Sequence, residues 1–133
     1  MKLVDTTFLV DLSRNERNAV NKSLELDKES NVFCAEVSVY EMILGIYAVK
    51  GIDHDKKLQK LETMFSKFNL LPLDHTSAIK AGEIAGTLTT EGKIISDTDC
   101  MIAGISLSND IGTIITRNKK HFARIKGLTV EEY

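Results

Sequence analysis

The chain has 133 residues, of which 43% are hydrophobic, and its formal net charge at pH 7 is −2. This length suits one domain with a core of ordinary size, so we expect residues 1–133 to form a single domain. Two cysteines are too few for a disulfide framework or a cysteine-based zinc site, and the charge gives no global sign of a nucleic-acid partner. No apolar run approaches the roughly 18 residues of a membrane span, and the N-terminus does not resemble a signal peptide. We therefore expect a cytoplasmic protein with no membrane partner.

The first half of the chain alternates short β-type runs with helical patterns. A buried strand at Leu3–Val4 is predicted to end at Asp5, and apolar residues follow at helical spacing from Thr6 to Leu12. The pattern then predicts a polar surface helix at Asn15–Ser30 and a strand at Val32–Ala35. It continues with an almost wholly apolar helix at Glu36–Tyr47, an amphipathic helix at His54–Phe68 and a strand at Leu70–Leu73. Pro72 predicts an edge position for the last of these strands, because proline cannot donate to a ladder.

The second half continues the alternation. It predicts an Ala- and Ile-rich helix at Thr76–Thr90, a loop at Glu91–Thr98 and a largely buried helix at Asp99–Leu107. A strand at Thr113–Thr116 and a final short strand at Leu128–Val130 follow. Strands that alternate with helices favour a parallel sheet covered on both faces. The predicted fold class is therefore α/β, a three-layer α/β/α arrangement around a central, mostly parallel sheet of four to five strands.

Three acids, Asp5, Glu41 and Asp99, stand near the starts of predicted helices that accompany the strands. Each has a structural explanation, because Asp caps helices well and Ser38 to Glu41 has the spacing of a capping box. The predicted topology nevertheless takes all three helix starts to the carboxyl edge of the sheet, where ligands bind in open α/β folds. Converging carboxylates repel one another unless a cation lies between them, and oxygen ligands suit Mg²⁺ or Mn²⁺. The sequence therefore predicts a divalent-cation site at this edge.

The same edge receives polar residues from the end of the strand Thr113–Thr116. Thr116, Arg117 and Asn118 bring a hydroxyl, a cation and an amide, and they begin the one basic patch of the chain, which comprises Arg117, Lys119, Lys120, Arg124 and Lys126. A solvated turn is the alternative explanation of this patch. Because a bound divalent ion can activate water and stabilise charge on a phosphoryl group, the leading predicted chemistry is metal-assisted phosphodiester hydrolysis.

Four motifs in order carry a resemblance to a known family. They are VDTTFLVDL, SVYEMILGI, DTDCMIAGISL and TIITRNKKHFARIKGLTVEEY, and together they resemble PIN domains, specifically the VapC-type toxins of toxin–antitoxin pairs. The resemblance implies that Asp5, Glu41 and Asp99 match the acidic cluster that binds Mg²⁺ or Mn²⁺. Asp97, two residues before Asp99, contributes to this cluster or replaces that member of it.

The resemblance also implies a reaction and partners. The reaction is endonucleolytic cleavage of RNA by a metal-activated water, and the partners are a cognate antitoxin protein and a second copy of the chain in a homodimer. Arg117 and Lys119 would contact phosphate, as positioning contacts. The residues predicted to line or bind the substrate are Thr6, Thr116, Arg117, Asn118 and Lys119. Asn118 stands where the family often has a fourth acid, which leaves one carboxylate fewer for a second metal ion.

Other functions compete with this interpretation. A receiver-type signalling module would use Asp5 as a metal ligand and Asp74 as the phosphoacceptor, and an aspartyl phosphatase would need a second acid where Thr7 stands. A catalytically inactive PIN-like binding domain is the third alternative, which a metal titration of RNA cleavage separates from an enzyme. The histidines favour no other mechanism; His121, in the basic turn, is expected to be a surface histidine.

Overall fold

The computed structural model describes all 133 residues and contains five strands and seven helices. The strands are β1 (Lys2–Val4), β2 (Val32–Ala35), β3 (Asn69–Leu71), β4 (Thr113–Ile115) and β5 (Thr129–Glu131). The helices are α1 (Thr6–Ser13), α2 (Arg17–Leu26), α3 (Glu36–Tyr47), α4 (His54–Phe65), α5 (His75–Thr90), α6 (Asp97–Ser108) and α7 (Lys119–Phe122). No helix is long and apolar enough to cross a bilayer.

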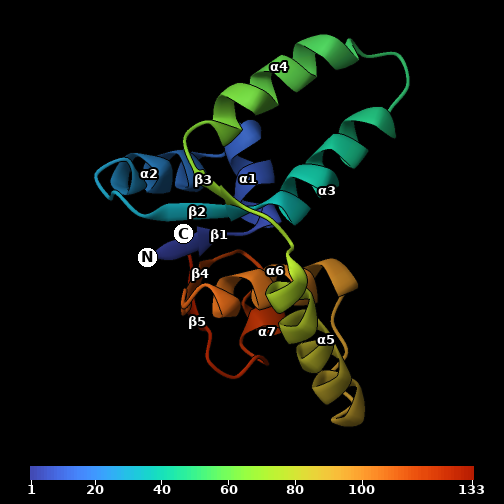
Figure 1. Cartoon of the computed structure of the whole chain (residues 1–133). Coiled ribbons are helices and arrows are strands. Elements are labelled where there is room, and N and C mark those ends of the chain that lie inside the picture. Colours follow the sequence, from blue (N-terminus) through green and yellow to red (C-terminus); the bar gives the residue numbers. More distant parts are fainter.

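The five strands form one sheet in the order β3-β2-β1-β4-β5, and every neighbouring pair is parallel. Figure 1 shows the sheet between two helical layers, with α1 to α4 on one face and α5 to α7 on the other. The predicted three-layer α/β/α class is confirmed, and the sheet is wholly parallel with the fifth strand present. The edge position predicted for the third strand is also confirmed, because β3 is the outermost strand on its side, but the strand covers Asn69–Leu71 instead of Leu70–Leu73 and Pro72 lies just after it.

The sheet contributes to two apolar cores because successive strand residues point to opposite faces. Val4, Cys34 and Ile115 face α1 to α4, whereas their neighbours Leu3, Ala35 and Ile114 face α5 to α7. All six side chains are completely buried. Strands covered on both faces are apolar throughout, which is why these short runs read as continuous hydrophobic segments in the sequence.

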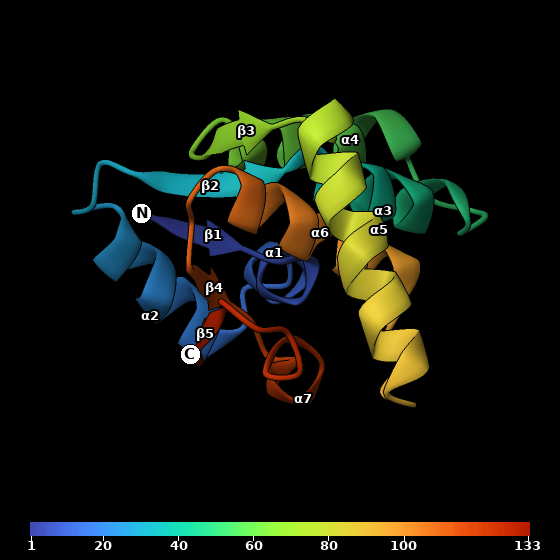
Figure 2. The same cartoon turned by 60° about the horizontal axis from the view of Figure 1, so that its bottom comes forward.

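Helix α6 packs closely against α5, and the contact depends on one glycine. A Cβ at Gly104 would lie 2.7 Å from the backbone nitrogen of Ala81 and 2.7 Å from the backbone oxygen of Ser77. Figure 2 shows the two helices crossing on the same face of the sheet. The close approach fixes α6, whose first turn reaches the carboxyl edge of the sheet.

The main differences from the predicted elements lie at helix ends. The surface helix is confined to α2, and α4 ends at Phe65 instead of Phe68. Helix α6 begins at Asp97 instead of Asp99, because the Ser96 hydroxyl accepts a hydrogen bond from the backbone N–H of Asp99 at 3.2 Å and so acts as the N-cap. The basic turn contains the short helix α7.

The strand order reverses between β1 and β4. The chain leaves β1 towards β2 on one side, and β4 continues to β5 on the other, so the order reverses between these two central strands. Ligands of open α/β sheets bind outside the carboxyl ends of the strands at such a reversal. The order also contradicts the receiver alternative, whose sheet runs 2-1-3-4-5. Asp74 follows the edge strand β3, with β2 between it and the strand that leads to Asp5.

Candidate active site at the carboxyl edge of the sheet

Asp5 lies at the reversal point and is 1% exposed. Its backbone N–H donates to the Ile115 carbonyl at 3.1 Å, which fixes it beside the end of β4. One carboxylate oxygen, Oδ1, accepts from the Phe8 backbone N–H at 3.1 Å and from the Thr7 hydroxyl at 2.7 Å. The other, Oδ2, accepts from the Thr116 hydroxyl at 2.6 Å. Asp5 therefore caps α1, as the structural explanation predicts, and it also joins the ends of β1 and β4.

Burial raises the pKa of the Asp5 carboxyl from 3.8 to about 6, and the negative charge of Asp99 adds to this rise. The hydrogen bonds from Thr116, Thr7 and Phe8 act in the opposite direction but do not cancel the effect of burial. The ionised form of Asp5 is thus destabilised in this position. A cation near Asp5 would stabilise the ionised form, because opposite charges attract strongly in a buried site.

Glu41 lies in the second turn of α3 and reaches towards α1 and α6. Its Oε1 accepts from the Thr6 hydroxyl at 2.6 Å, and its Oε2 accepts from the Thr98 hydroxyl at 3.1 Å. The capping-box explanation of Glu41 is wrong, because α3 begins at Glu36 and Ser38 lies buried inside the helix. Two hydroxyls from other elements, and not a local backbone contact, hold the Glu41 carboxylate.

Asp99 faces the C-terminal segment of the chain. Its Oδ2 lies 2.9 Å from Nδ1 of His121, and the Asp99 side chain is 13% exposed. No local pattern in the sequence predicts this partner of Asp99. The turn of α7 after β4 brings the imidazole back to the start of α6. Asp97 is exposed in the first turn of α6 and makes no hydrogen bond or ion pair.

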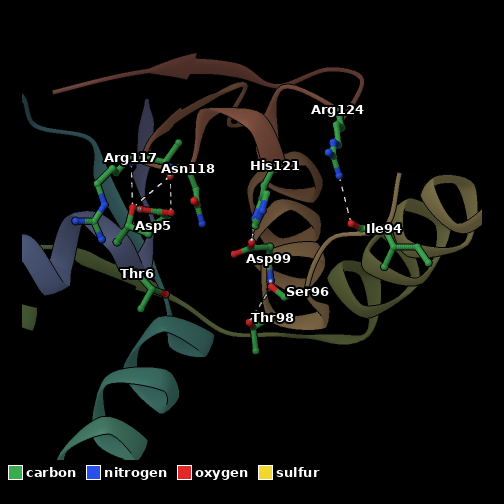
Figure 3. Close-up of polar contacts among 12 residues, drawn as sticks. Asp5, Thr6, Ile94, Ser96, Thr98, Asp99, Arg117, Asn118, His121 and Arg124 are labelled. Atoms are coloured by element: carbon green, nitrogen blue, oxygen red, sulfur yellow. Dashed lines mark hydrogen bonds and ion pairs between the residues drawn. The ribbon is translucent and has the colours of Figure 1, made fainter. Parts of the chain in front are cut away.

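Figure 3 shows how side chains of this edge are placed. Asp5, Thr6 and Asn118 lie on one side of the view, and Asp99 and His121 lie on the other. No three His, Cys, Asp or Glu side chains are close enough together, as they stand, to hold a metal ion. Each acid is instead directed by its own hydroxyl or imidazole partner. The structure thus brings three carboxylates to one edge without forming a ready-made group of three ligands.

The donor chemistry of this edge fits a hard divalent cation. Asp5, Glu41 and Asp99 offer carboxylate oxygens, and Thr6 and Thr116 offer hydroxyl oxygens beside them. Neither cysteine is available, because both thiols are buried in the apolar cores. Carboxylate and hydroxyl oxygens without thiolates favour ions of the Mg²⁺ and Mn²⁺ class.

The predicted substrate-binding residues follow β4 directly. The Arg117 guanidinium is 60% exposed and donates to Asp11 at 2.9 Å, and the Asn118 backbone N–H donates to Thr116 at 2.8 Å. Lys119 is exposed. Arg124, which the sequence groups with them, is engaged elsewhere, because it donates to the carbonyls of Lys93 and Ile94 (Figure 3).

Most of the chain matches one family. Residues 2–128 match the family described as the PIN domain. The protein belongs to the PIN domain family. The predicted resemblance is therefore confirmed, and the three acids lie on a PIN fold.

Similar PIN proteins cover nearly the full chain. The tRNA(fMet)-specific endonuclease VapC of Salmonella typhimurium is 26% identical over 131 residues, which are 98% of this chain and 96% of that protein. Ribonuclease VapC1 of Methanocaldococcus jannaschii is 28% identical over 131 residues, 98% of this chain and 85% of that protein. The crystal structure of DNA-bound VapBC from Salmonella typhimurium superposes with a TM-score of 0.86 at 25% identity, covering 98% of this chain and 96% of that one.

Proposed function

We propose that this PIN protein is a metal-dependent endoribonuclease that acts as the toxin of a toxin–antitoxin pair. The observation that carries the proposal is that three carboxylates, from the starts of α1 and α6 and the second turn of α3, lie along the same carboxyl edge of a parallel sheet. The relatives named as VapC endonuclease and ribonuclease support the choice of RNA as the substrate.

We propose Mg²⁺ or Mn²⁺ as the ion, held by Asp5, Glu41 and Asp99, with Asp97 as a further acid at the exposed rim. When bound, such an ion supplies an activated water and stabilises the charge that develops on the phosphoryl group. The chain itself holds the acids in place: Thr116 and Thr7 orient Asp5, two further threonines orient Glu41, and an imidazole orients Asp99.

The remaining residues of the edge bind the RNA in this proposal. Thr6 and Thr116 line the site, and Arg117 and Lys119 contact phosphates without reading bases. Asn118 supplies an amide where a fourth acid would add negative charge. With fewer carboxylates, the edge repels an RNA strand less, because each additional acid faces the phosphates with the same sign of charge.

The proposed partners are an antitoxin and a second copy of the chain, and the proposed location is the cytoplasm. The similar VapBC structure from Salmonella typhimurium supports the antitoxin. A groove of about 660 Å³ between α1, α3 and α4 has an apolar floor that includes Met42, Ile46 and Leu61, with Glu41 among its lining residues. On α3, Tyr40, Leu44 and Tyr47 are more than half exposed and present a second apolar face. We also propose that residues 1–133 act as one domain.

A catalytically inactive PIN-like binding domain is the second candidate. The observation that favours it is that no three potential ligands form a metal-binding group as they stand. The two candidates differ in one measurable property, since only the enzyme cleaves RNA in a metal-dependent way.

The test is cleavage of a labelled single-stranded RNA after the protein has been stripped with EDTA. Mg²⁺ or Mn²⁺ should restore cleavage in wild type, and Glu41→Gln should reduce it by about a hundredfold or more. Glu36→Gln is the matched control, because Glu36 lies exposed on the same helix. Cleavage that is absent at every metal concentration would favour the binding domain, and cleavage unaffected by Glu41→Gln would remove Glu41 from the site.

A further inference from the structure

Arg117 is held on its side-chain end by a buried acid that the proposed reaction does not use. Asp11, on α1, is only 5% exposed, although an unpaired charge in such a position is strongly unfavourable. Its Oδ1 accepts from Arg117 Nη1 at 2.9 Å, and its Oδ2 accepts from the hydroxyl of Tyr133 at 2.6 Å. Both oxygens of Asp11 are therefore occupied by donors that come from the last part of the chain.

Tyr133 is the last residue of the chain, and its ring is fixed as well as its hydroxyl. The ring packs edge-on against Phe8, with centroids 5.1 Å apart and planes at 81°. Burial and the negative charge of Asp11 both raise the pKa of the phenol, so the hydroxyl remains a donor to that carboxylate. Tyr133 is thus built into the support of the site edge.

Arg117 is held at its backbone too. Its N–H donates to the Thr7 hydroxyl at 3.0 Å, and the same hydroxyl donates to Asp5 at 2.7 Å. An arginine carries a fork of five N–H donors, and this side chain is 60% exposed despite its contact with Asp11. The direction of the guanidinium is therefore fixed, and some of its N–H donors remain free towards solvent. The backbone of Arg117 is linked to Asp5 through the Thr7 hydroxyl.

We propose that Asp11 and Tyr133 are positioning residues that hold the Arg117 guanidinium ready for an RNA phosphate flanking the scissile bond. This inference rests on the proposed ribonuclease function. A free arginine loses much of its rotamer freedom when it binds a phosphate, whereas an arginine that is already fixed loses less. The benefit belongs to substrate binding and not to the chemical step.

Simple electrostatics makes the opposite prediction for a variant that lacks the charge of Asp11. Removal of the negative charge of Asp11 leaves the region more positive, so charge alone would tighten RNA binding. Positioning predicts weaker binding, because Arg117 keeps its charge but loses its fixed direction. The sign of the effect therefore separates the two explanations.

The experiment measures kcat and KM for metal-activated cleavage of a labelled single-stranded RNA. Asp11→Asn and Tyr133→Phe should each raise KM about fivefold and leave kcat within twofold. Tyr133→Phe keeps the ring on Phe8 and removes only the hydroxyl, so it tests the idea even if Asp11→Asn unfolds. Glu62→Gln, an acid-to-amide change at an exposed position of α4 whose side chain makes no hydrogen bond or ion pair, is the control and should leave KM within twofold.

A double-mutant cycle completes the test. If Asp11 acts through Arg117, then Asp11→Asn should add nothing to the KM of Arg117→Ala. A lowered KM in Asp11→Asn, an unchanged KM in Tyr133→Phe, or effects of Asp11 and Arg117 that simply add would each overturn the positioning role. These outcomes leave metal-dependent cleavage by wild type intact, whereas a wild-type protein that cleaves no RNA would instead refute the proposed function.

Discussion

Asp5 and Asp74 begin from the same local design and end in different environments. Each follows a strand of the sheet, and each caps the helix that comes next through a hydrogen bond to a backbone N–H three residues on. Asp74 is closed into a capping box with Ser77, and these hydrogen bonds lower the pKa of its carboxyl. Asp5 is buried, and burial raises the pKa of its carboxyl to about 6.

The difference comes from the strand that each residue follows. Asp74 follows β3 at the edge of the sheet, and its hydrogen bonds are all local. Asp5 follows β1 at the centre, where Thr116 reaches it from β4 and the charge of Asp99 acts on it from α6. A helix cap is thus a local feature, whereas a site arises where a cap also receives side chains from distant segments.

The largest expected effect comes from changing the two aspartates in parallel. Asp5→Asn should reduce metal-dependent RNA cleavage by about a hundredfold or more, while the asparagine still caps α1. Asp74→Asn, the matched change at the edge strand, should leave the cleavage rate within twofold. Equal losses in the two variants, with both folded by circular dichroism, would contradict the distinction between the two positions.

The pH dependence of stability should have opposite signs at the two residues. Because the folded pKa of Asp5 is raised from 3.8 to about 6, its contribution is present below pH 4 and is lost as pH rises through 6. For the protein in EDTA this loss amounts to about 3 kcal/mol of unfolding free energy. Asp74, with a lowered pKa, contributes stability above pH 4 that is lost as pH falls.

Urea unfolding in EDTA at pH 4, 5, 6 and 7 measures this dependence. Asp5→Asn should reduce the fall in unfolding free energy between pH 4 and 7, and Asp74→Asn should leave that fall unchanged. The same pH dependence of the unfolding free energy in wild type and in Asp5→Asn would show that burial does not destabilise the ionised Asp5 carboxylate.

The smallest effect concerns the cap alone. Asp74→Ala removes the side-chain acceptor of the capping box and should lower Tm by roughly a few degrees, with RNA cleavage unchanged at 25 °C. Thermal unfolding followed by circular dichroism measures the shift. A loss of cleavage that exceeds the loss of folded protein would assign Asp74 a role in the site and remove the contrast with Asp5.

Much of the fold was predictable because its signals are local. Short apolar runs between helical patterns predict buried parallel strands, and Pro72 predicts the edge position of β3. Helix ends were less predictable, since α6 starts where the Ser96 hydroxyl captures a backbone N–H, and several residues nearby could have done so. At Glu41 a local pattern predicted a helix start that does not exist, because the capping-box spacing from Ser38 to Glu41 occurs inside α3.

The partners of the acids were not predictable from local patterns. His121 lies 22 residues beyond Asp99, and Tyr133 lies 122 residues beyond Asp11. Neither spacing matches a helix or strand period, so only the packing of α7 and the C-terminal tail on the sheet brings these groups together.

The sequence by itself determined the order of strands and helices, the apolar faces that bury them and the acids near helix starts, because each of these depends on neighbours a few residues away. The tertiary structure decided which capping acid becomes part of a site, which side chains hold the acids and Arg117, and how far apart the carboxylates lie. Those properties depend on burial and on contacts between distant segments, which exist only once the two helical layers have packed against the sheet.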